Sequence, residues 1–301
     1  MIRQKWMVSF SAAALASMLA SAALADCSQL PTQQQLKTAV TNVVAGGSNG
    51  GLGFNMWATL VAADGTVCAV AFSGQSYVDQ WLGSRVISAQ KANTANAFSL
   101  GTGSTPATSL VGTKGLALST ANLFTAVQPG GSLYGLQHSN PVDTEIAYGN
   151  AASPPPGFSN ANLQQGQGNA ENFGTPKDPM VGLRVGGVNV FGGGLAAYRN
   201  GVRVGGLGVS GDTSCTDHMV AWKVRHVLGL DQLGAVGGVS PDAKRPDNII
   251  FDINPNGGIP SNDGGTGQAP SGTGGVGQSA SGFGHPKCLN NPDPTSLPQV
   301  Q

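Results

Sequence analysis

Charged side chains are scarce in this chain. Only 15 Lys and Arg and 15 Asp and Glu occur in 301 residues, and the formal net charge is zero. The sequence has no basic stripe and no acidic tail. Nucleic acids and anionic membrane surfaces are bound largely through clustered positive charge, so the composition argues against both kinds of partner. Glycine, by contrast, is abundant at 46 residues, about twice its usual share.

Long apolar stretches are also lacking, except near the start of the chain. Residues 1–25 have the pattern of a secretory signal: Arg3 and Lys5, an apolar stretch over 8–19, and the small-residue site Ala23-Leu24-Ala25. The apolar stretch is short for a bilayer span and is interrupted by serines, which favours cleavage over anchoring. We therefore expect a mature protein that is periplasmic or secreted and has no membrane span.

Cysteine is rare, and all four copies lie in the expected mature chain: Cys27, Cys68, Cys215 and Cys288. Export to an oxidising compartment predicts two disulfides. Four cysteines allow three pairings, and spacing does not choose among them. We favour Cys27 with Cys68 and Cys215 with Cys288, since each bond would tie a terminal segment to the core. No CxxCH string is present, which excludes covalent haem attachment of the c type.

Hydrophobic periodicity and turn signals predict an α+β fold. Two hairpins are expected, one over 56–73 around Asp64-Gly65 and one pairing 195–198 with 202–209 around Asn200-Gly201. Further elements are expected as helices at 31–45, 84–98 (with Ser84 as its cap), 116–127 and 216–228, and as strands at 133–137 and 248–253. The order of elements indicates one antiparallel sheet with helices packed against it.

Composition divides the chain further. Residues 26–233 are expected to form one domain, interrupted at 138–182 by a polar segment rich in Asn, Gln, Gly and Pro that we interpret as a surface insertion. Residues 234–301 are rich in Gly, Pro and Ser. A segment so poor in apolar side chains buries too little surface to offset its ordering entropy, so this extension is expected to be largely flexible.

The string Gly206-x-Gly208-x-x-Gly211 matches the dinucleotide fingerprint, and Asp231 follows at a suitable distance. The strand before it, however, is the second arm of the Asn-Gly hairpin, and no strand separates the next helix from Asp231. A structural role in bends and close helix packing is therefore favoured. A nucleophile elbow at Ser210 is disfavoured as well, because Asp212 replaces the second glycine of that motif.

The histidines are the candidate ligands for a metal or haem iron. His218 and His226 lie on one face of the last predicted helix but two turns apart, too far for the compact pair of an HExxH helix. His138 and His218 are the candidate haem-iron ligands, since neutral imidazole suits that role. Hydrogen-bonded structural histidines remain the alternative at both positions. His285 falls in the expected flexible tail and is a weaker candidate.

Lys91 lies among small residues on an otherwise uncharged stretch of its predicted helix. It could line a pocket for a carboxylate, such as a haem propionate or a small acid. The alternative is a surface lysine whose stem covers apolar area while its ammonium stays in water.

Four segments together resemble the GlcG/HbpS-like haem-binding family: the Asp-Gly hairpin, SAQKANTANAF (88–98), GGVNVFGGG (186–194) and GLGVSGDTSCTDHMVAWKVR (206–225). The resemblance covers about residues 31–230. It implies a compact α+β domain of profilin-like or sensor-like architecture. Members of the family often form symmetric oligomers, and some bind haem or accompany glycolate or corrinoid metabolism, so a homo-oligomer is expected here too.

The expected function is that of an exported, non-catalytic haem-binding or haem-sensing protein. Its pocket is predicted where the Lys91 helix, the 192–194 strand and the start of the last helix meet. The candidate ligand-binding residues are Lys91, Asn93, Gly192, Gly193, Gly194, Arg203 and Asp217. The alternative is a binding module for a small organic acid such as glycolate, in which Lys91 and Arg203 would matter more than any histidine. An envelope enzyme is disfavoured because no catalytic constellation is apparent.

Overall fold

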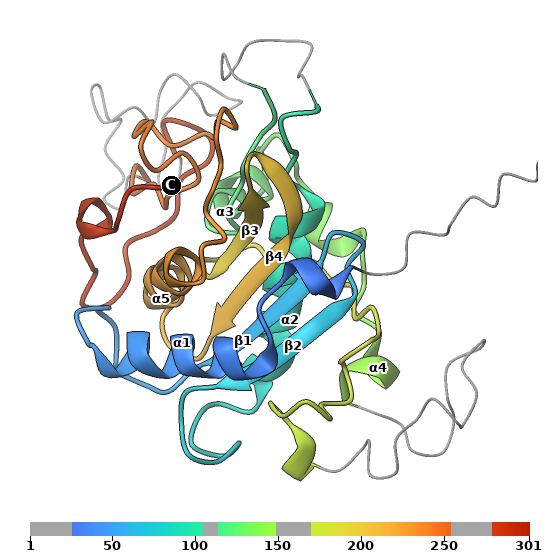
Figure 1. The fold of residues 1–301 in the computed structure, drawn as a ribbon. Coiled ribbons are helices and arrows are strands. Elements are labelled where there is room, and N and C mark those ends of the chain that lie inside the picture. The colour runs from blue at the N-terminus through green and yellow to red at the C-terminus, as the bar shows by residue number, and fades with distance from the viewer. Residues whose placement is uncertain (1–25, 105–113, 149–169, 254–278) are drawn as a thin grey trace, which may run out of the picture.

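A computed structural model describes residues 26–104, 114–148, 170–253 and 279–301 (Figure 1). The elements in these ranges are α1 (Gln33–Ala45), β1 (Trp57–Ala62), β2 (Val67–Phe72), α2 (Gly83–Ala97), α3 (Leu123–Ala126), α4 (Thr144–Tyr148), β3 (Gly194–Arg199), β4 (Val202–Ser210) and α5 (Ser214–Val227). Short 3₁₀ helices occur at Cys27–Gln29, Leu136–His138, Ala170–Asn172 and Pro294–Ser296. The expected signal at 1–25 lies outside the described residues.

The four strands form one antiparallel sheet in the order β2-β1-β4-β3. Both predicted hairpins are present, and β1 and β4 join them at the centre of the sheet. Asn200 and Gly201 have φ values of 50° and 78°, the positive φ values that a tight two-residue turn between twisted strands requires. The α+β class with an antiparallel sheet is confirmed.

Helices cover both faces of the sheet (Figure 1), with α2 on one face and α1 and α5 on the other. The alternation of β1 explains why both faces are buried. Ala58 and Leu60 belong to the cluster on the side of α1 and α5, whereas Trp57 and Val61 belong to the cluster on the side of α2. The sheet is thus the middle of three layers.

The glycine string in β4 is a packing device. A Cβ atom at Gly206 would clash with the carbonyl oxygen of Ala92, and one at Gly208 with the carbonyl oxygen of Ser88. Both oxygens belong to α2, so the helix backbone rests directly on the strand backbone. Because β4 is antiparallel to both of its neighbours, the strand context of a dinucleotide site is absent here. The structural interpretation of these glycines is confirmed.

Several local elements differ from expectation. Ser84 does not cap α2: the cap position is Leu82, with no side-chain bond. The helix expected over 116–127 shrinks to the single turn of α3. There the Ser119 backbone N–H donates to Asn122 Oδ1 (3.0 Å) and the Asn122 N–H donates to Ser119 Oγ (3.3 Å), local bonds that compete with helix formation.

The two expected extra strands do not form. Residues 133–137 make a turn that leads into the 3₁₀ helix Leu136–His138. Over 248–253 the chain makes only the isolated bridge of Ile253 with Ser279. The Ile249 N–H instead donates to side chains, to Asn248 Oδ1 at 2.9 Å and to His218 Nε2 at 3.2 Å. Side-chain acceptors therefore take the Ile249 N–H that a strand ladder would have used.

The segment expected as a surface insertion contributes to the core where it is described. Asp178 accepts from Arg85 Nε of α2 at 2.8 Å, and both side chains are buried. Ile146 and Met180 pack in the cluster on the side of α2. Residues 149–169 lie outside the described residues.

The extension expected to be flexible also packs onto the domain where it is described, beside α5 in Figure 1. Asp247 is fully buried and pairs with fully buried Arg225 of α5, with Nη2 and Oδ1 2.9 Å apart. Leu297 packs in the cluster under α1 and α5. Residues 234–253 and 279–301 therefore belong to the folded domain, which differs from the expected boundary at 233; residues 254–278 lie outside the described residues.

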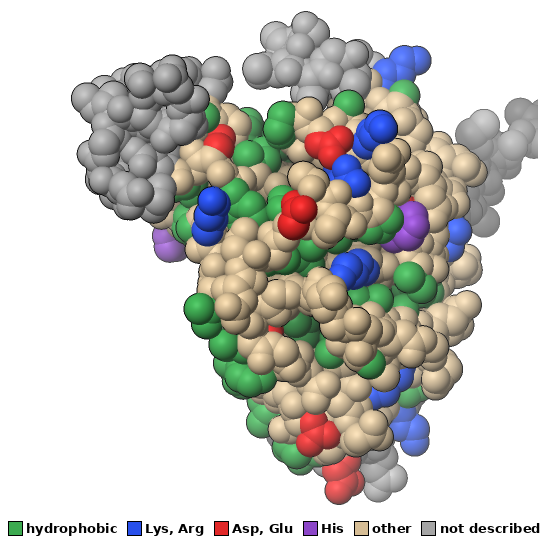
Figure 2. Space-filling model, turned by 90° about the vertical axis from the view of Figure 1, so that its left-hand side faces the viewer, with side chains coloured by type: hydrophobic (Ala, Val, Ile, Leu, Met, Phe, Trp, Pro, Cys, Tyr) green, Lys and Arg blue, Asp and Glu red, His purple; other side chains and the backbone are tan. Residues whose placement is uncertain are grey.

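Both favoured disulfides are present. Cys27 bonds to Cys68 with a Cα–Cα distance of 5.5 Å, and Cys215 bonds to Cys288 with a Cα–Cα distance of 6.0 Å. Among the described residues, no helix has the length and apolar character needed to cross a membrane. On the face shown in Figure 2, Lys and Arg side chains are scattered with acidic ones among them.

Candidate functional site

The three segments predicted to form the pocket do meet. A Cβ atom at Gly193, just before β3, would lie 3.0 Å from Lys91 Nζ of α2 and 2.9 Å from Asp217 Cβ of α5. A Cβ at Gly194 would lie 2.5 Å from the Lys91 carbonyl oxygen, and one at Gly192 would clash with that of Ser214. The glycines therefore permit close packing of these elements, and their surroundings are filled by protein atoms.

Lys91 and Asp217 form a buried ion pair at this junction. Their side chains are 0% and 1% exposed, with Nζ and Oδ2 2.7 Å apart. Lys91 Nζ also donates to the Val209 carbonyl oxygen at 3.2 Å. Burial lowers the pKa of Lys91 and raises the pKa of Asp217 to about 6, against the opposing attraction of Lys91. The alternative of a surface lysine is wrong, and the ammonium has its counter-charge inside the protein.

Asp217 also closes the bend between β4 and α5. Its Oδ1 accepts from the backbone N–H groups of Gly211 (3.1 Å) and Asp212 (2.9 Å). A carboxylate that accepts such bonds is stabilised in its charged form. The pair thus links α2 to the start of α5 and leaves neither charge free for a ligand.

The remaining predicted ligand-binding residues lie elsewhere. Asn93 donates to the Gly187 carbonyl oxygen at 2.9 Å. Arg203 on β4 bonds to Asn96 Oδ1 and to the Ala63 carbonyl oxygen. Burial lowers the pKa of Arg203. Lys91 and Arg203 therefore serve different contacts and do not form the joint cation site that a small acid would need.

The two candidate iron ligands are in different environments. His138 is exposed, in the 3₁₀ helix Leu136–His138. His218 is fully buried, and its Nε2 lies 3.1 Å from Asn248 Oδ1. Burial lowers the pKa of His218 to about 4, so the ring is neutral at pH 7. Its Nδ1 has no hydrogen-bond partner among the described residues.

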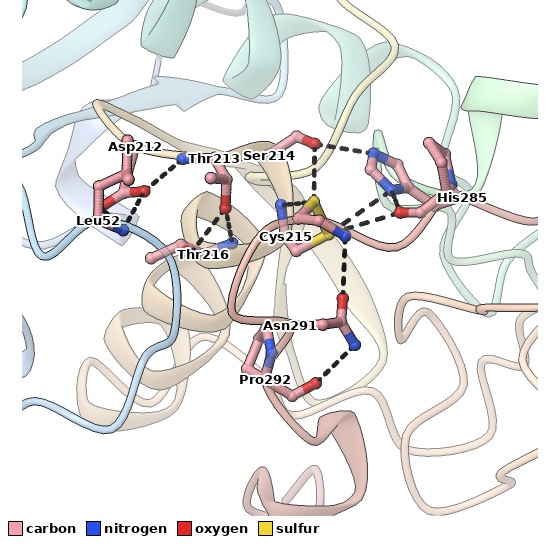
Figure 3. The surroundings of a disulfide bond; sticks show 11 residues. Leu52, Asp212, Thr213, Ser214, Cys215, Thr216, His285, Asn291 and Pro292 are labelled. Atoms are coloured by element: carbon pink, nitrogen blue, oxygen red, sulfur yellow. Dashed lines mark hydrogen bonds between the residues drawn. A yellow bond between two sulfur atoms is a disulfide. The ribbon is translucent and has the colours of Figure 1, made fainter.

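A third histidine, expected in a flexible tail, is the one that the structure places in a polar cluster (Figure 3). His285 is 1% exposed, and its Nε2 lies 3.1 Å from Ser214 Oγ at the start of α5. Its Nδ1 lies 2.7 Å from the Pro286 carbonyl oxygen. Burial lowers the pKa of His285 to about 4. The sequence carried one signal of this cluster: the favoured bond of Cys215 with Cys288 brings 285 close to 214.

Metal ligation in this cluster depends on the state of the two sulfurs. The ligand atoms of Cys215, His285 and Cys288 all lie within 4.8 Å of one another. Zinc is bound by thiolate sulfur, and here the two sulfurs are bonded to each other in the disulfide. The oxidised chain therefore offers a single imidazole, which is not a metal site.

A cavity with a volume of about 790 Å³ lies at the start of the C-terminal segment. We call it the C-terminal cavity. Its wall consists of Leu116, Gly234, Ala235, Val236, Gly237, Gly238, Val239, Ser240, Pro241, Ala243, Pro246, Ser281 and Phe283. The wall is mainly apolar, and none of its described residues is a histidine, cysteine, methionine or charged residue. Sequence reasoning missed it because this segment was expected to be flexible.

Comparisons with known proteins give only distant likenesses. No protein-family model and no curated protein matches the chain. The crystal structure of the Klebsiella pneumoniae protein ORFY, assigned to the family model DUF336, is similar over 65% of this chain and 86% of its own, with 20% identity and a TM-score of 0.37. A PduOC:heme complex is similar over 64% of this chain and 88% of its own, with 23% identity and a TM-score of 0.36.

At TM-scores this low, neither neighbour carries an argument about the family or the site.

Proposed function

We propose that this protein binds a flat, largely apolar organic ligand of the tetrapyrrole class, with haem as the first candidate, in the C-terminal cavity. One observation carries the proposal: a mainly apolar cavity of about 790 Å³. Ligand sites typically enclose about 300–1,000 Å³ and have apolar walls with a few polar groups. The role is binding or sensing, without catalysis by the ligand's site.

Haem fits this cavity in part. Val236, Val239 and Phe283 offer apolar surface to the faces of a macrocycle, and Ser240 and Ser281 offer hydroxyls at the wall. No side chain of the wall is a usual iron ligand. Binding would then rest on burial of the macrocycle, at roughly 25 cal/mol per Å² of apolar surface. Haem, when bound, would supply an iron centre there.

The candidate ligands His138 and His218 are not in the wall of this cavity. They remain a prediction for a different placement of the haem, in which His218 Nδ1, without a partner among the described residues, would be the ligand atom. The geometry favours the C-terminal cavity because His218 is fully buried and its Nε2 already accepts from the Ile249 N–H.

A small organic acid is the second ligand class. It would need an uncompensated cation, and Lys91 is neutralised by Asp217 at 2.7 Å. Arg203 is the remaining candidate, partly exposed and bonded to Asn96. This alternative is therefore disfavoured, and a thermal-shift comparison of hydroxy acids with tetrapyrroles tests it.

We also propose that the mature chain acts outside the cytoplasm. Two disulfides support an oxidising compartment, and residues 1–25 have the signal pattern. The amino-terminal sequence of the protein recovered from the periplasm or medium should begin near Asp26. Recovery of uncleaved, reduced chain from the cytoplasm alone would contradict export.

Titration of the mature chain with haem and with iron-free protoporphyrin tests the binding proposal. Because the wall lacks an iron ligand, both should bind saturably and with affinities within a few-fold of each other. Ala243→Phe fills the cavity from an exposed wall position and should weaken both by at least about tenfold, the effect of about 1.4 kcal/mol. Ala45→Phe, at the exposed end of α1, is the matched control and should change neither.

Three outcomes would overturn the assignment. The first is the absence of a saturable Soret or fluorescence change with either tetrapyrrole. The second is loss of haem binding in His138→Ala or His218→Ala together with normal binding by Ala243→Phe, which would move the site to the histidines. A thermal shift with hydroxy acids and none with tetrapyrroles would favour the small-acid class instead.

A further inference from the structure

Ser214 and His285 have the arrangement of a nucleophile and its base, a feature that the proposed binding function does not use. Ser214 Oγ and His285 Nε2 are 3.1 Å apart (Figure 3). The Nδ1–H of His285 donates to the Pro286 carbonyl oxygen at 2.7 Å. That bond fixes the tautomer, because it leaves the Nε2 lone pair to accept the serine proton. A nucleophile, a base and a group that orients the base are the parts of a hydrolytic triad.

The surroundings of Ser214 can stabilise a developing negative charge. Ser214 is the first residue of α5, a helix of 14 residues whose N-terminus carries partial positive charge. The next backbone N–H, that of Cys215, has the Cys288 sulfur as its acceptor at 3.2 Å. Sulfur is a weak acceptor, so this N–H is only weakly paired and is the donor next to Ser214 that an oxyanion would use. The N–H after the nucleophile has that role in nucleophile-elbow hydrolases.

The position in the fold fits as well. Ser214 follows strand β4 and a short bend and begins a helix, the strand–turn–helix context of an elbow serine. The serine of the glycine string, Ser210, is only 3% exposed, whereas Ser214 is partly exposed. Ser214 is therefore partly open to solvent, while its base is shielded from water.

The disulfide holds the two residues together. Ser214 and His285 are 71 positions apart in the sequence, and the bond of Cys215 with Cys288 joins their immediate neighbourhoods. Phe124 packs on the imidazole with ring centroids 5.1 Å apart. The disulfide thus ties the tail to the start of α5, and the ring contact packs His285 against α3.

We propose that Ser214 and His285 form a nucleophile–base pair for acyl transfer from small carboxylic esters, and that the Cys215–Cys288 disulfide keeps the pair assembled. Ser214 Oγ attacks the ester carbonyl carbon while its proton passes to His285 Nε2. The C–O bond to the alcohol breaks, and the alcohol leaves with that proton. Water then attacks the acyl-serine, gives a proton to Nε2, and the released Ser214 Oγ takes it back as the acid departs.

A fluorophosphonate probe and p-nitrophenyl acetate test the proposal on the mature, oxidised chain. The probe should label Ser214, as located by peptide mass spectrometry. Ester cleavage should fall at least about 10²-fold in Ser214→Ala, the usual range for losing a positioned catalytic group. Ser139→Ala, at an exposed serine of the surface, is the matched control and should keep full activity.

His285→Gln should lower the labelling rate at least about tenfold with its melting temperature close to that of the wild type. Cys215→Ala/Cys288→Ala should also lower the labelling rate, because the variant lacks the disulfide that holds Ser214 and His285 together. Where either of these variants fails to fold, the mapped label and Ser214→Ala still decide the matter. Absence of label at Ser214, or cleavage in Ser214→Ala within twofold of wild type, would overturn the proposal.

The outcome is separable from that of the tetrapyrrole proposal. Ala243→Phe changes the C-terminal cavity and should leave ester cleavage unchanged. Ser214→Ala should leave haem and protoporphyrin binding unchanged. Loss of both properties in one of these variants would contradict the assignment of two separate sites.

Discussion

Replacing Lys91 by methionine tests the buried ion pair at the junction of α2, β3 and α5. Methionine has a similar length but no charge, so Lys91→Met leaves Asp217 buried with only the Gly211 and Asp212 N–H groups as donors. Removing one partner of a buried pair typically costs about 3–5 kcal/mol. With both side chains at most 1% exposed and a separation of 2.7 Å, we expect a loss of unfolding free energy in that range.

The pH dependence of this loss has a definite sign. Lys91 opposes the rise of the Asp217 pKa, so the pKa of Asp217 rises further above about 6 once Lys91 is gone. A carboxyl whose folded pKa is raised contributes stability that is present below its unfolded pKa and lost as the pH rises through its folded pKa. The deficit of Lys91→Met should therefore be smallest near pH 4 and largest above pH 7.

Urea unfolding at pH 4, 5.5 and 7.5 measures the deficit, with disulfides intact. Lys177→Met, at an exposed position, is the control and should change stability by no more than about 0.5 kcal/mol. Lys91→Met/Asp217→Asn removes both charges and keeps an oxygen acceptor for the Gly211 and Asp212 N–H groups, so it should recover most of the loss. If the unfolding free energy of Lys91→Met lies within about 1 kcal/mol of the wild-type value at pH 7.5, this account of the pair is refuted.

Three further predictions concern stability. Gly208→Ala should abolish or strongly reduce soluble expression, because its Cβ would clash with a backbone oxygen of α2; a melting curve like that of wild type would contradict this. Cys215→Ala/Cys288→Ala opens a loop of sequence separation 73 and should lower the unfolding free energy by about 4 kcal/mol in urea; a loss under 1 kcal/mol would count against it. Burial lowers the pKa of His218 and of His285 to about 4, so stability that is present above about pH 6.5 should fall as the pH drops to 4. The loss should be roughly 3 kcal/mol per histidine, partly offset by the raised pKa of Asp217 in the buried pair. The urea midpoint of His285→Gln should fall less over this pH range than that of wild type, and an equal fall would exclude His285 as the origin of the loss.

The sheet and its covering helices could be predicted because their signals are local. Asp64-Gly65 and Asn200-Gly201 mark hairpins within a few residues, and helical spacing marks α1, α2 and α5. The failures have local causes too. Ser119 and Asn122 bond to each other's backbone and stop the expected helix, a competition that apolar spacing does not reveal.

Ion pairs between residues far apart in the chain could not be predicted from the sequence. Lys91 and Asp217 are 126 positions apart, and each alone reads as a ligand residue. Asp247 looked like part of a flexible tail until its pairing with Arg225 placed that segment in the core. A single sequence does not show which charges will meet, so both the filled junction and the folded tail were missed.

The candidate site illustrates the same point. The disulfide pairing was favoured for the right reason, a terminal segment tied to the core, yet composition still assigned His285 to a flexible region. Once Cys288 is bonded to Cys215, His285 has to lie near the start of α5. The covalent bond, and not the composition of the segment, determines where residues 285–288 lie.

The measurement that bears most directly on the binding proposal is a structure of the mature, oxidised chain with iron-free protoporphyrin or haem bound. We predict the macrocycle in the C-terminal cavity, against Val236 and Phe283, with no protein side chain from the wall on the iron. A haem ligated by His138 or His218, or a tetrapyrrole at any other surface, would contradict the proposal.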